Sequence, residues 1–444
     1  ITNIEFEDGP SDGRDPPDHG GGLYIIDSSP TITDCIITNC ASFGNGAGVY
    51  IENSSALIEN CTITDNIAYS DGSGGGICAT GTPIGSSPCR IIDCVISDNI
   101  SGTSGGLSIT HQNIEIINNS IIENIGGTGS GAGGIGVNSP DALIYSNYIY
   151  RNDGATGGGI GISGGSPTII GNMIVENEAG LGGGIYSRGY FIYMENNTIS
   201  MNTATGSPYG TGGIRISQCD TVYLHNNIIW GNEAPNGSVQ NMLVYDTYLT
   251  ISFTSIEGGY DSIWVDSTST IIWGPGNIDA DPLFESGPIC DYHLSMSSPC
   301  IDAGNPSVEY NDPEDPFNPG YALWPAMGYL RNDMGAFGGG GVGYWLSVEE
   351  EEQASPPEED SSLICYPNPS LGSVSIMMPL AFIANTDILV YDITGKLVRR
   401  FTDLETNVIQ WDCDDESGRE VPSGVYLIQG ISGKQSLSVR FVKI

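Results

Sequence analysis

Lysine is missing from most of this chain, and the first one is Lys396. In total the 444 residues contain 13 Lys and Arg against 53 Asp and Glu, which gives a formal net charge of −40. Nucleic acids and anionic membranes are bound through clusters of Lys and Arg. We therefore expect no nucleic-acid partner, and an acidic exterior that is solvated or attracts divalent cations and basic partners.

Long hydrophobic runs are also missing, so we expect no membrane span. There is no initiator methionine and no stretch that resembles a signal peptide. The chain opens at ITNIEFEDG, which is similar to the last strand of a repeat described below. We expect Ile1 to be the start of a processed or truncated chain.

What the sequence does contain is a repeat of about 25 to 33 residues with two conserved polar columns. The first column holds Cys35, Cys61, Cys94, Asn119, Asn147, Asn172, Asn197 and Asn227. The second column, five residues later, holds Cys40, Asn66, Asn99, Asn124, Asn152, Asn177, Asn202 and Asn232. An isoleucine stands between the columns in each repeat. A period of this length indicates a solenoid, in which each repeat packs against its neighbours.

Each repeat contains three short stretches with alternating apolar residues and no helical pattern. Glycine runs precede one of these stretches and mark turns. Three short strands per repeat predict a right-handed parallel β-helix. Stacked asparagines at a bend hydrogen-bond to one another and satisfy buried amides, so we expect the two columns to form internal ladders without chemical function.

The repeat weakens after Asn232, and three strings follow it: GNIDADPLF (276–284), SPCIDAG (298–304) and DMGAF (333–337). These strings resemble the terminal segment of a family of bacterial right-handed parallel β-helix surface proteins. The resemblance covers residues 1 to about 345. It implies the fold and exposure at a cell surface, and it does not imply one activity.

The last part of the chain has a different pattern. Residues 347–362 form an acidic, proline-containing linker. Beyond it, YPNP (366–369), VYDITGKLV (390–398) and VPSGVYLI (421–428) resemble the C-terminal sorting domain of type IX secretion cargo, although Cys413 stands where that family usually has a glycine-containing turn. The resemblance implies a small β-sandwich, the type IX machinery as a partner, and a place outside a Gram-negative, Bacteroidota-like cell or on its outer membrane.

We therefore predict an all-β protein with three parts: a β-helix over 1–346, the linker over 347–362, and the sorting domain over 363–444. The 11 cysteines are an odd number. Those in the ladder columns are expected to be packed thiols. For an oxidising compartment, three disulfides are plausible: Cys78–Cys89, Cys290–Cys300 and Cys365–Cys413.

The sequence contains no clear set of catalytic residues. A polysaccharide lyase or hydrolase requires an acid–base set beside the substrate. Arg188 and Arg215 fall in adjacent repeats, with Glu195 and Asp220 in the same region, but they make no defined set. We assign no catalytic residue and expect a protein that is not an enzyme.

Two binding sites are predicted instead. Outward aromatic and basic residues suggest stacking on sugar rings: Tyr24, Tyr50, Tyr186, Arg215, Tyr150 and Trp230. Oxygen ligands in one loop suggest Ca²⁺ as a cofactor: Asp312, Glu314, Asp315 and Asn318. The favoured function is a secreted or surface structural, adhesive protein that polymerises into a filament or sheath. The alternative is a surface protein that binds or cleaves polysaccharide.

Overall fold

The computed structural model is all-β, and no α-helix occurs in the part of the chain that it describes. It describes residues 1–2, 4–7, 19–127, 129, 131–206, 210–235, 239–286, 290–316, 318–339, 363–366, 374–377, 386–392, 396–402, 404, 408–422, 424–432 and 435–443. The chain divides into two units: residues 1–284 with 293–348, and residues 285–292 with 349–444. The predicted linker, 347–362, lies outside the described residues.

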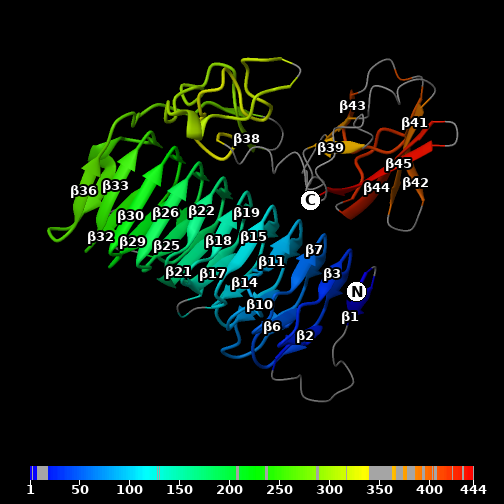
Figure 1. Ribbon diagram of the computed structural model, residues 1–444, viewed down its shortest axis with the longest axis horizontal. Coiled ribbons are helices and arrows are strands. Elements are labelled where there is room, and N and C mark those ends of the chain that lie inside the picture. Colours follow the sequence, from blue (N-terminus) through cyan, green and yellow to red (C-terminus); the bar gives the residue numbers. More distant parts are fainter. Residues whose placement is uncertain are drawn as a thin grey trace. The chain divides into compact units, whose positions relative to one another are not determined.

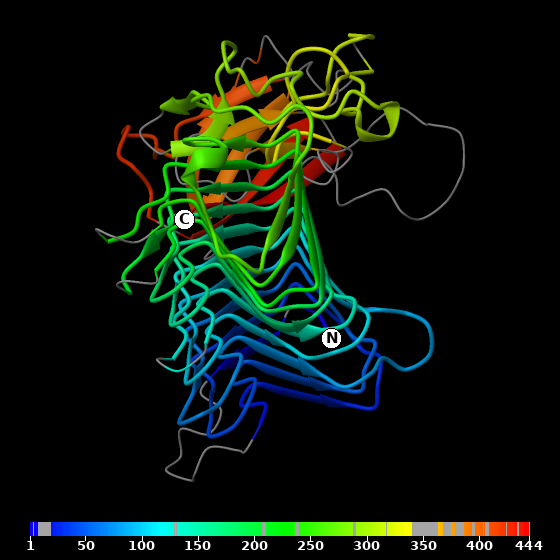
Figure 2. The same ribbon diagram turned by 90° about the vertical axis from the view of Figure 1, so that its left-hand side faces the viewer.

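The first unit is a coil with three parallel ten-stranded sheets, here named A, B and C (Figures 1 and 2). Sheet A contains β3 (Thr31–Thr33), β7 (Leu57–Glu59), β11 (Cys89–Ile92), β15 (Ile114–Ile117), β18 (Leu143–Tyr145), β22 (Thr168–Ile170), β26 (Phe191–Glu195), β30 (Thr221–His225), β33 (Tyr248–Ser252) and β36 (Thr270–Trp273). Sheet B contains β1 (Glu5–Glu7), β4 (Ile36–Thr38), β8 (Thr62–Thr64), β12 (Val95–Ser97), β16 (Ser120–Ile122), β19 (Tyr148–Tyr150), β23 (Met173–Val175), β27 (Thr198–Ser200), β31 (Ile228–Trp230) and β34 (Ser255–Ile256). Sheet C contains β2 (Leu23–Ile26), β6 (Val49–Glu52), β10 (Ile77–Thr80), β14 (Leu107–Ile109), β17 (Ile135–Ser139), β21 (Ile160–Gly165), β25 (Ile185–Ser187), β29 (Ile214–Ser217), β32 (Met242–Tyr245) and β35 (Ile263–Val265).

Shorter elements complete this unit. Two three-stranded sheets lie at the corner between sheets B and C: β5 (Ala41–Ser42), β9 (Ile67–Ala68) and β13 (Ile100–Ser101), then β20 (Asp153–Gly154), β24 (Glu178–Ala179) and β28 (Thr203–Ala204). Later in the chain come η1 (Tyr260–Ser262) and η2 (Val308–Tyr310). A separate two-stranded sheet, β37 (Phe284–Ser286) and β38 (Cys290–Leu294), includes residues 285–286 and 290–292 of the second unit. The prediction of a right-handed parallel β-helix is confirmed.

The corners on both sides of sheet B explain where the polar columns come from. The residue before each ladder position adopts a positive φ, for example Asn118 at 52° before Asn119 and Arg151 at 51° before Asn152. Asn, Asp and Gly tolerate this left-handed conformation best, and they fill most of these positions. The bend turns the following side chain into the interior, so a polar residue there requires a partner.

The ladder asparagines supply that partner to one another. Asn147 donates from its backbone N and from Nδ2 to Oδ1 of Asn172, at 2.9 Å each. Asn172 donates in the same way to Oδ1 of Asn197, at 3.0 Å each. Nδ2 of Asn172 also donates to the backbone oxygen of Ile144 at 2.9 Å. The side chains are fully buried, so each carboxamide is satisfied by the coils on either side.

Between the ladders runs the apolar core of the coil. The isoleucines of sheet B, such as Ile121, Ile149 and Ile174, are in register from strand to strand and have no exposed surface. Inward residues of sheets A and C, such as Ile144 and Ile162, join them in one continuous cluster. Each coil thus buries its apolar side chains against its neighbours, as solenoids do.

The segment up to Gly339 folds back onto sheet B of the coil. Ala336 N donates to Thr198 Oγ1 at 3.0 Å, and Gly335 N donates to the backbone oxygen of Asn226 at 2.8 Å. Asn196 Nδ2 donates to the backbone oxygen of Asp333 at 2.9 Å. This segment, residues 295–339, is called the return segment below. It covers the outer face of β27 and β31.

The second unit contains two antiparallel sheets. One has the order β39 (Ile364–Tyr366), β40 (Val374–Met377), β43 (Val408–Trp411), and the other has the order β42 (Leu397–Phe401), β41 (Thr386–Asp392), β44 (Gly424–Ser432), β45 (Gln435–Lys443). Ile376, Val390, Trp411 and Phe441 share one apolar core. Two sheets on one core form the β-sandwich that was predicted.

Candidate functional site

The first two aromatic residues of the predicted sugar-binding row on sheet C differ in exposure. Tyr24 is 54% exposed, and its ring stacks on Tyr50 at 5.3 Å. Tyr50 is 6% exposed because His19 stacks on its other side at 4.6 Å. Burial raises the pKa of Tyr50, and the nearby carboxylate of Glu52 adds to this effect. Tyr50 is therefore a packed residue and offers no face to a sugar.

Further along the same row, Tyr186 and Arg215 are register neighbours on β25 and β29. Burial lowers the pKa of Arg215, and the positive charge of Arg188 lowers it further, while Tyr186 opposes the change. The Arg188 guanidinium donates to Gln218 Oε1 at 2.5 Å. Two guanidinium groups thus lie near one another on adjacent coils of a strongly acidic protein.

Tyr150 and Trp230 lie on a different sheet. Tyr150 is 4% exposed, with Tyr148 stacked at 5.3 Å and the Arg151 guanidinium over its ring at 4.7 Å. Trp230 packs against the cluster that contains Ile228 and the return segment. The six predicted sugar contacts are therefore divided between sheets C and B, and the structure does not gather them into one site.

The predicted calcium ligands are not gathered either. The Asp312 carboxylate is buried and accepts hydrogen bonds from the backbone N of Gly339 at 2.5 Å and of Asp333 at 3.1 Å. Glu314 Oε1 instead accepts from the backbone N of Gly320 at 2.7 Å. Asp315 and Asn318 belong to the local turn. Among the residues that the structure describes, no group of three or more His, Cys, Asp or Glu is placed to hold a metal ion.

Asp312 instead forms a buried acidic pair with Asp333 inside the return segment. Asp333 Oδ1 accepts from the backbone N of Asp302 at 2.6 Å, and Oδ2 accepts from Met327 N at 2.8 Å. Burial raises the pKa of both carboxyl groups, and the charge of Asp333 raises that of Asp312 further. The pair ties three stretches of the return segment together through backbone N–H groups.

An exposed aromatic surface that the sequence analysis missed lies on sheet A, where β26, β30 and β33 run side by side (Figure 1). We name it the aromatic ledge: Tyr190, Phe191, Tyr193, Tyr223 and Tyr248. Tyr190 is 63% exposed, Phe191 47% and Tyr248 44%. The rings of Phe191 and Tyr223 lie 5.5 Å apart. Contiguous exposed apolar surface of this kind marks an interaction site.

One end of the ledge meets polar side chains under the return segment. The Tyr193 hydroxyl donates to Glu195, and burial raises the pKa of both groups. His225 contacts Ser252 Oγ at 2.7 Å and Asn305 Nδ2 at 2.9 Å, and burial lowers its pKa. Because Glu195 is held by Tyr193 and Arg188 by Gln218, the structure does not join the candidate arginines and acids into an acid–base set.

One of the three predicted disulfides, Cys78–Cys89, is wrong, and the other two stay predictions. Cys78 points outward from β10 and Cys89 inward from β11, in two different sheets, and both are free, buried thiols. Cys300 is buried against Ile228 and Met334, and the side chain of Cys290 lies outside the described part of the chain. Cys365 and Cys413 share the core of the second unit, so that pairing stays a prediction.

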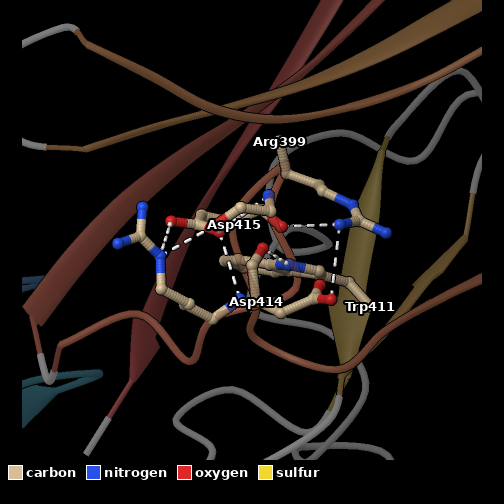
Figure 3. A network of polar contacts seen from close by, with 6 residues as sticks. Arg399, Trp411, Asp414 and Asp415 are labelled. Atoms are coloured by element: carbon tan, nitrogen blue, oxygen red, sulfur yellow. Dashed lines mark hydrogen bonds and ion pairs between the residues drawn. The ribbon is translucent and has the colours of Figure 1, made fainter.

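A polar network joins β42 and Trp411 to the turn after β43 (Figure 3). Arg399 Nη1 donates to the Asp415 backbone oxygen at 2.7 Å and pairs with Asp414 Oδ2 at 3.3 Å. Trp411 Nε1 donates to the Asp414 backbone oxygen at 2.9 Å. The turn after β43 is therefore fixed by one arginine and by the buried tryptophan.

Residues 1–129 and 84–255 match the right handed beta helix region family, which covers more than half of the chain. The chain belongs to the right-handed β-helix family. Residues 364–444 match the secretion system C-terminal sorting domain. The protein is thus a β-helix protein with a type IX sorting tail, exported to the cell surface or the extracellular space, as in Bacteroidota.

No curated protein matches the chain. Among solved structures, PorZ, an essential surface component of the type IX secretion system of Porphyromonas gingivalis, matches with 27% identity and a TM-score of 0.16. That match covers 18% of this chain and 11% of PorZ, so it carries no argument here. Within the described residues, no helix has the length and apolar character needed to cross a membrane.

Proposed function

We propose that this protein is an adhesive rod at the cell surface that binds carbohydrate through the aromatic ledge. The observation that carries the proposal is the exposure of Tyr190, Phe191 and Tyr248 together on one face of sheet A. Aromatic rings combine a large apolar face with a defined orientation, and the apolar face of a sugar ring stacks on such rings. The type IX tail supports a place outside the cell.

The spacing on the ledge suits an extended glycan. Phe191 and Tyr248 are both in register with Thr221 of the strand between them. Neighbouring strands are about 4.8 Å apart, so the two rings lie two strand spacings from one another, comparable with the length of a disaccharide. Gln218 and Asp220 are exposed in the turn before β30 and offer hydrogen-bonding groups for sugar hydroxyls.

Substitution of the ledge rings tests the proposal. A glycan array first identifies a bound oligosaccharide, and its affinity is then measured by titration. The Phe191→Ala/Tyr248→Ala protein is expected to bind about tenfold more weakly or worse, because each aromatic contact contributes about 0.5–1.5 kcal/mol beyond the area that it buries. Tyr24→Ala is the control, because Tyr24 is equally exposed on sheet C. No binding on the array, or a loss only in Tyr24→Ala, would contradict the proposal.

We propose binding without cleavage. Glu195, on the same strand as Phe191 and Tyr193, is occupied by the Tyr193 hydroxyl, which supports a packing role. No new reducing ends and no unsaturated product are expected when the bound glycan is incubated with the protein. Release of either product would favour the alternative, a polysaccharide-cleaving enzyme.

A second candidate function is self-association into a filament or sheath, as the sequence predicted. Sheet A ends at β36, which pairs only with β33 in the described part of the chain, and its Ile272 is 43% exposed. An outermost strand offers backbone groups to strands of other chains. Electron microscopy of the purified protein tests this function: regular fibres support it, and dispersed particles at high concentration contradict it.

A further inference from the structure

A groove of about 640 Å³ lies at the corner between sheets B and C, in the last two turns of the coil. One wall consists of residues 231–233 and 239–241, and the other of residues between Glu257 and Trp264. Trp264 is the outward residue of β35 and is 47% exposed. The groove is on a different sheet from the aromatic ledge, so it has no part in the function proposed above.

The charges in this groove have one sign. Its charged residues in the described part of the chain are Glu233, Glu257 and Asp261. Glu257 Oε2 is held by the backbone N of Gly231 at 2.9 Å and by Asn241 Nδ2 at 3.4 Å. Glu233 and Asp261 are exposed to solvent. An ammonium or guanidinium group fits between such carboxylates, and the face of a tryptophan attracts the same cations.

The edge of β35 beside the groove is open. In the described residues β35 pairs only with β32. Asp266 N donates to the Val244 backbone oxygen at 3.2 Å, and the N–H groups of a strand alternate between its two sides. The Val265 N–H therefore points away from β32, toward the unpaired side. Such an edge accepts an added strand from an extended peptide.

We propose that this groove and the free edge of β35 form a docking site for an extended polypeptide segment that carries lysine or arginine. The backbone of the segment pairs with β35, and its alternate side chains reach Glu233 and Asp261 and lie over Trp264. Electrostatic complementarity selects a basic segment. The backbone edge selects a polypeptide over a small amine or an amino sugar, which have no strand to add.

The test uses a fluorescein-labelled octapeptide of alternating lysine and threonine, with an alternating glutamate and threonine octapeptide as the negative probe. Fluorescence anisotropy at about 0.15 M salt, where long-range attraction is screened, measures binding to the full chain. The basic probe is expected to bind and the acidic probe to fail. Glu233→Gln/Asp261→Asn and Trp264→Ala are each expected to weaken binding about tenfold.

Two further variants separate this site from general attraction to an acidic protein. Glu178→Gln removes an exposed carboxylate on β24, at the same corner but outside the groove, and is expected to leave binding unchanged. Val265→Pro removes the outward N–H and leaves pairing with β32 in place, and is expected to abolish binding with an unchanged circular dichroism spectrum. Equal loss in Glu178→Gln, or full binding by Val265→Pro, overturns the proposal. The proposal is also overturned if the protein associates with itself through the groove and the basic octapeptide does not inhibit this association.

Discussion

Asn172→Leu is expected to lower the unfolding temperature of the β-helix more than any surface substitution. The leucine removes Oδ1, which accepts two hydrogen bonds from Asn147, and Nδ2, which donates to Asn197, Ile144 and Ile170. The backbone N and Nδ2 of Asn147 then stay buried without this acceptor. Each orphaned buried group costs about 1–3 kcal/mol, so the total loss is on the order of 3–5 kcal/mol.

Thermal unfolding followed by circular dichroism measures this loss, and Asn138→Leu is the matched control. Asn138 is an exposed asparagine of β17, so its replacement tests the effect of leucine alone and is expected to leave the transition in place. Because a solenoid is stabilised coil by coil, the Asn172→Leu transition is also expected to broaden. Equal melting of the two variants would show that the ladder does not stabilise the coil.

Asp312→Asn is expected to stabilise the return segment at alkaline pH. Burial raises the pKa of Asp312 to about 9 and that of Asp333 to about 7, against about 3.9 in an unfolded chain. The folded state thus holds protons that the unfolded state releases, and stability falls as pH rises from about 4 to about 9. Removing one charge is expected to flatten this fall, because the substituted residue no longer releases a proton on unfolding.

Hydrogen exchange of residues 300–339 between pH 5 and pH 9 measures this effect in the segment itself, after correction for the intrinsic exchange rate. Asp302 also faces the pair and raises both pKa values, so part of the pH dependence is expected to persist in Asp312→Asn. Glu309→Gln is the control, because Glu309 is exposed on η2. If Asp312→Asn loses protection at pH 9, the carboxylate is needed in its charged form and the expectation fails.

The class of fold could be predicted because every repeat contains the sequence pattern of one coil. An aliphatic residue such as Ile149 between two polar columns recurs in every coil, and the bends need residues that accept a positive φ. The sorting tail could be predicted because it is matched over residues 364–444. Both signals lie within single repeats or a single domain, where neighbours in sequence are neighbours in space.

The sites could not be predicted in the same way, because they depend on which side chains are buried by residues from other parts of the chain. Tyr50 has the same outward position as Tyr24, but it lies between Tyr24 and His19, and these two stacked rings bury it. Asp312 appeared to belong to a calcium loop, but contacts with Asp333 and Gly339 turn it inward. The alternation of FIYME (191–195) and YLTIS (248–252) indicates which residues of the aromatic ledge point outward, but it does not indicate that neighbouring coils leave them exposed.

The ladders also have a direction, with a mechanical consequence. In the bonds between ladder asparagines, the donor always lies in the coil before the acceptor. The last coils must therefore supply other acceptors: Asn241 Oδ1 accepts from Asn232 Nδ2 at 3.0 Å, and Thr254 Oγ1 accepts from Asn227 N at 3.3 Å. Loss of the last coil leaves N–H donors of the ladder without an acceptor. Loss of the first coil instead leaves carbonyl oxygens of the ladder without a donor, and carbonyl acceptors tolerate the loss of a partner better. The coil is therefore expected to unravel more readily from its N-terminal turns than from its C-terminal turns.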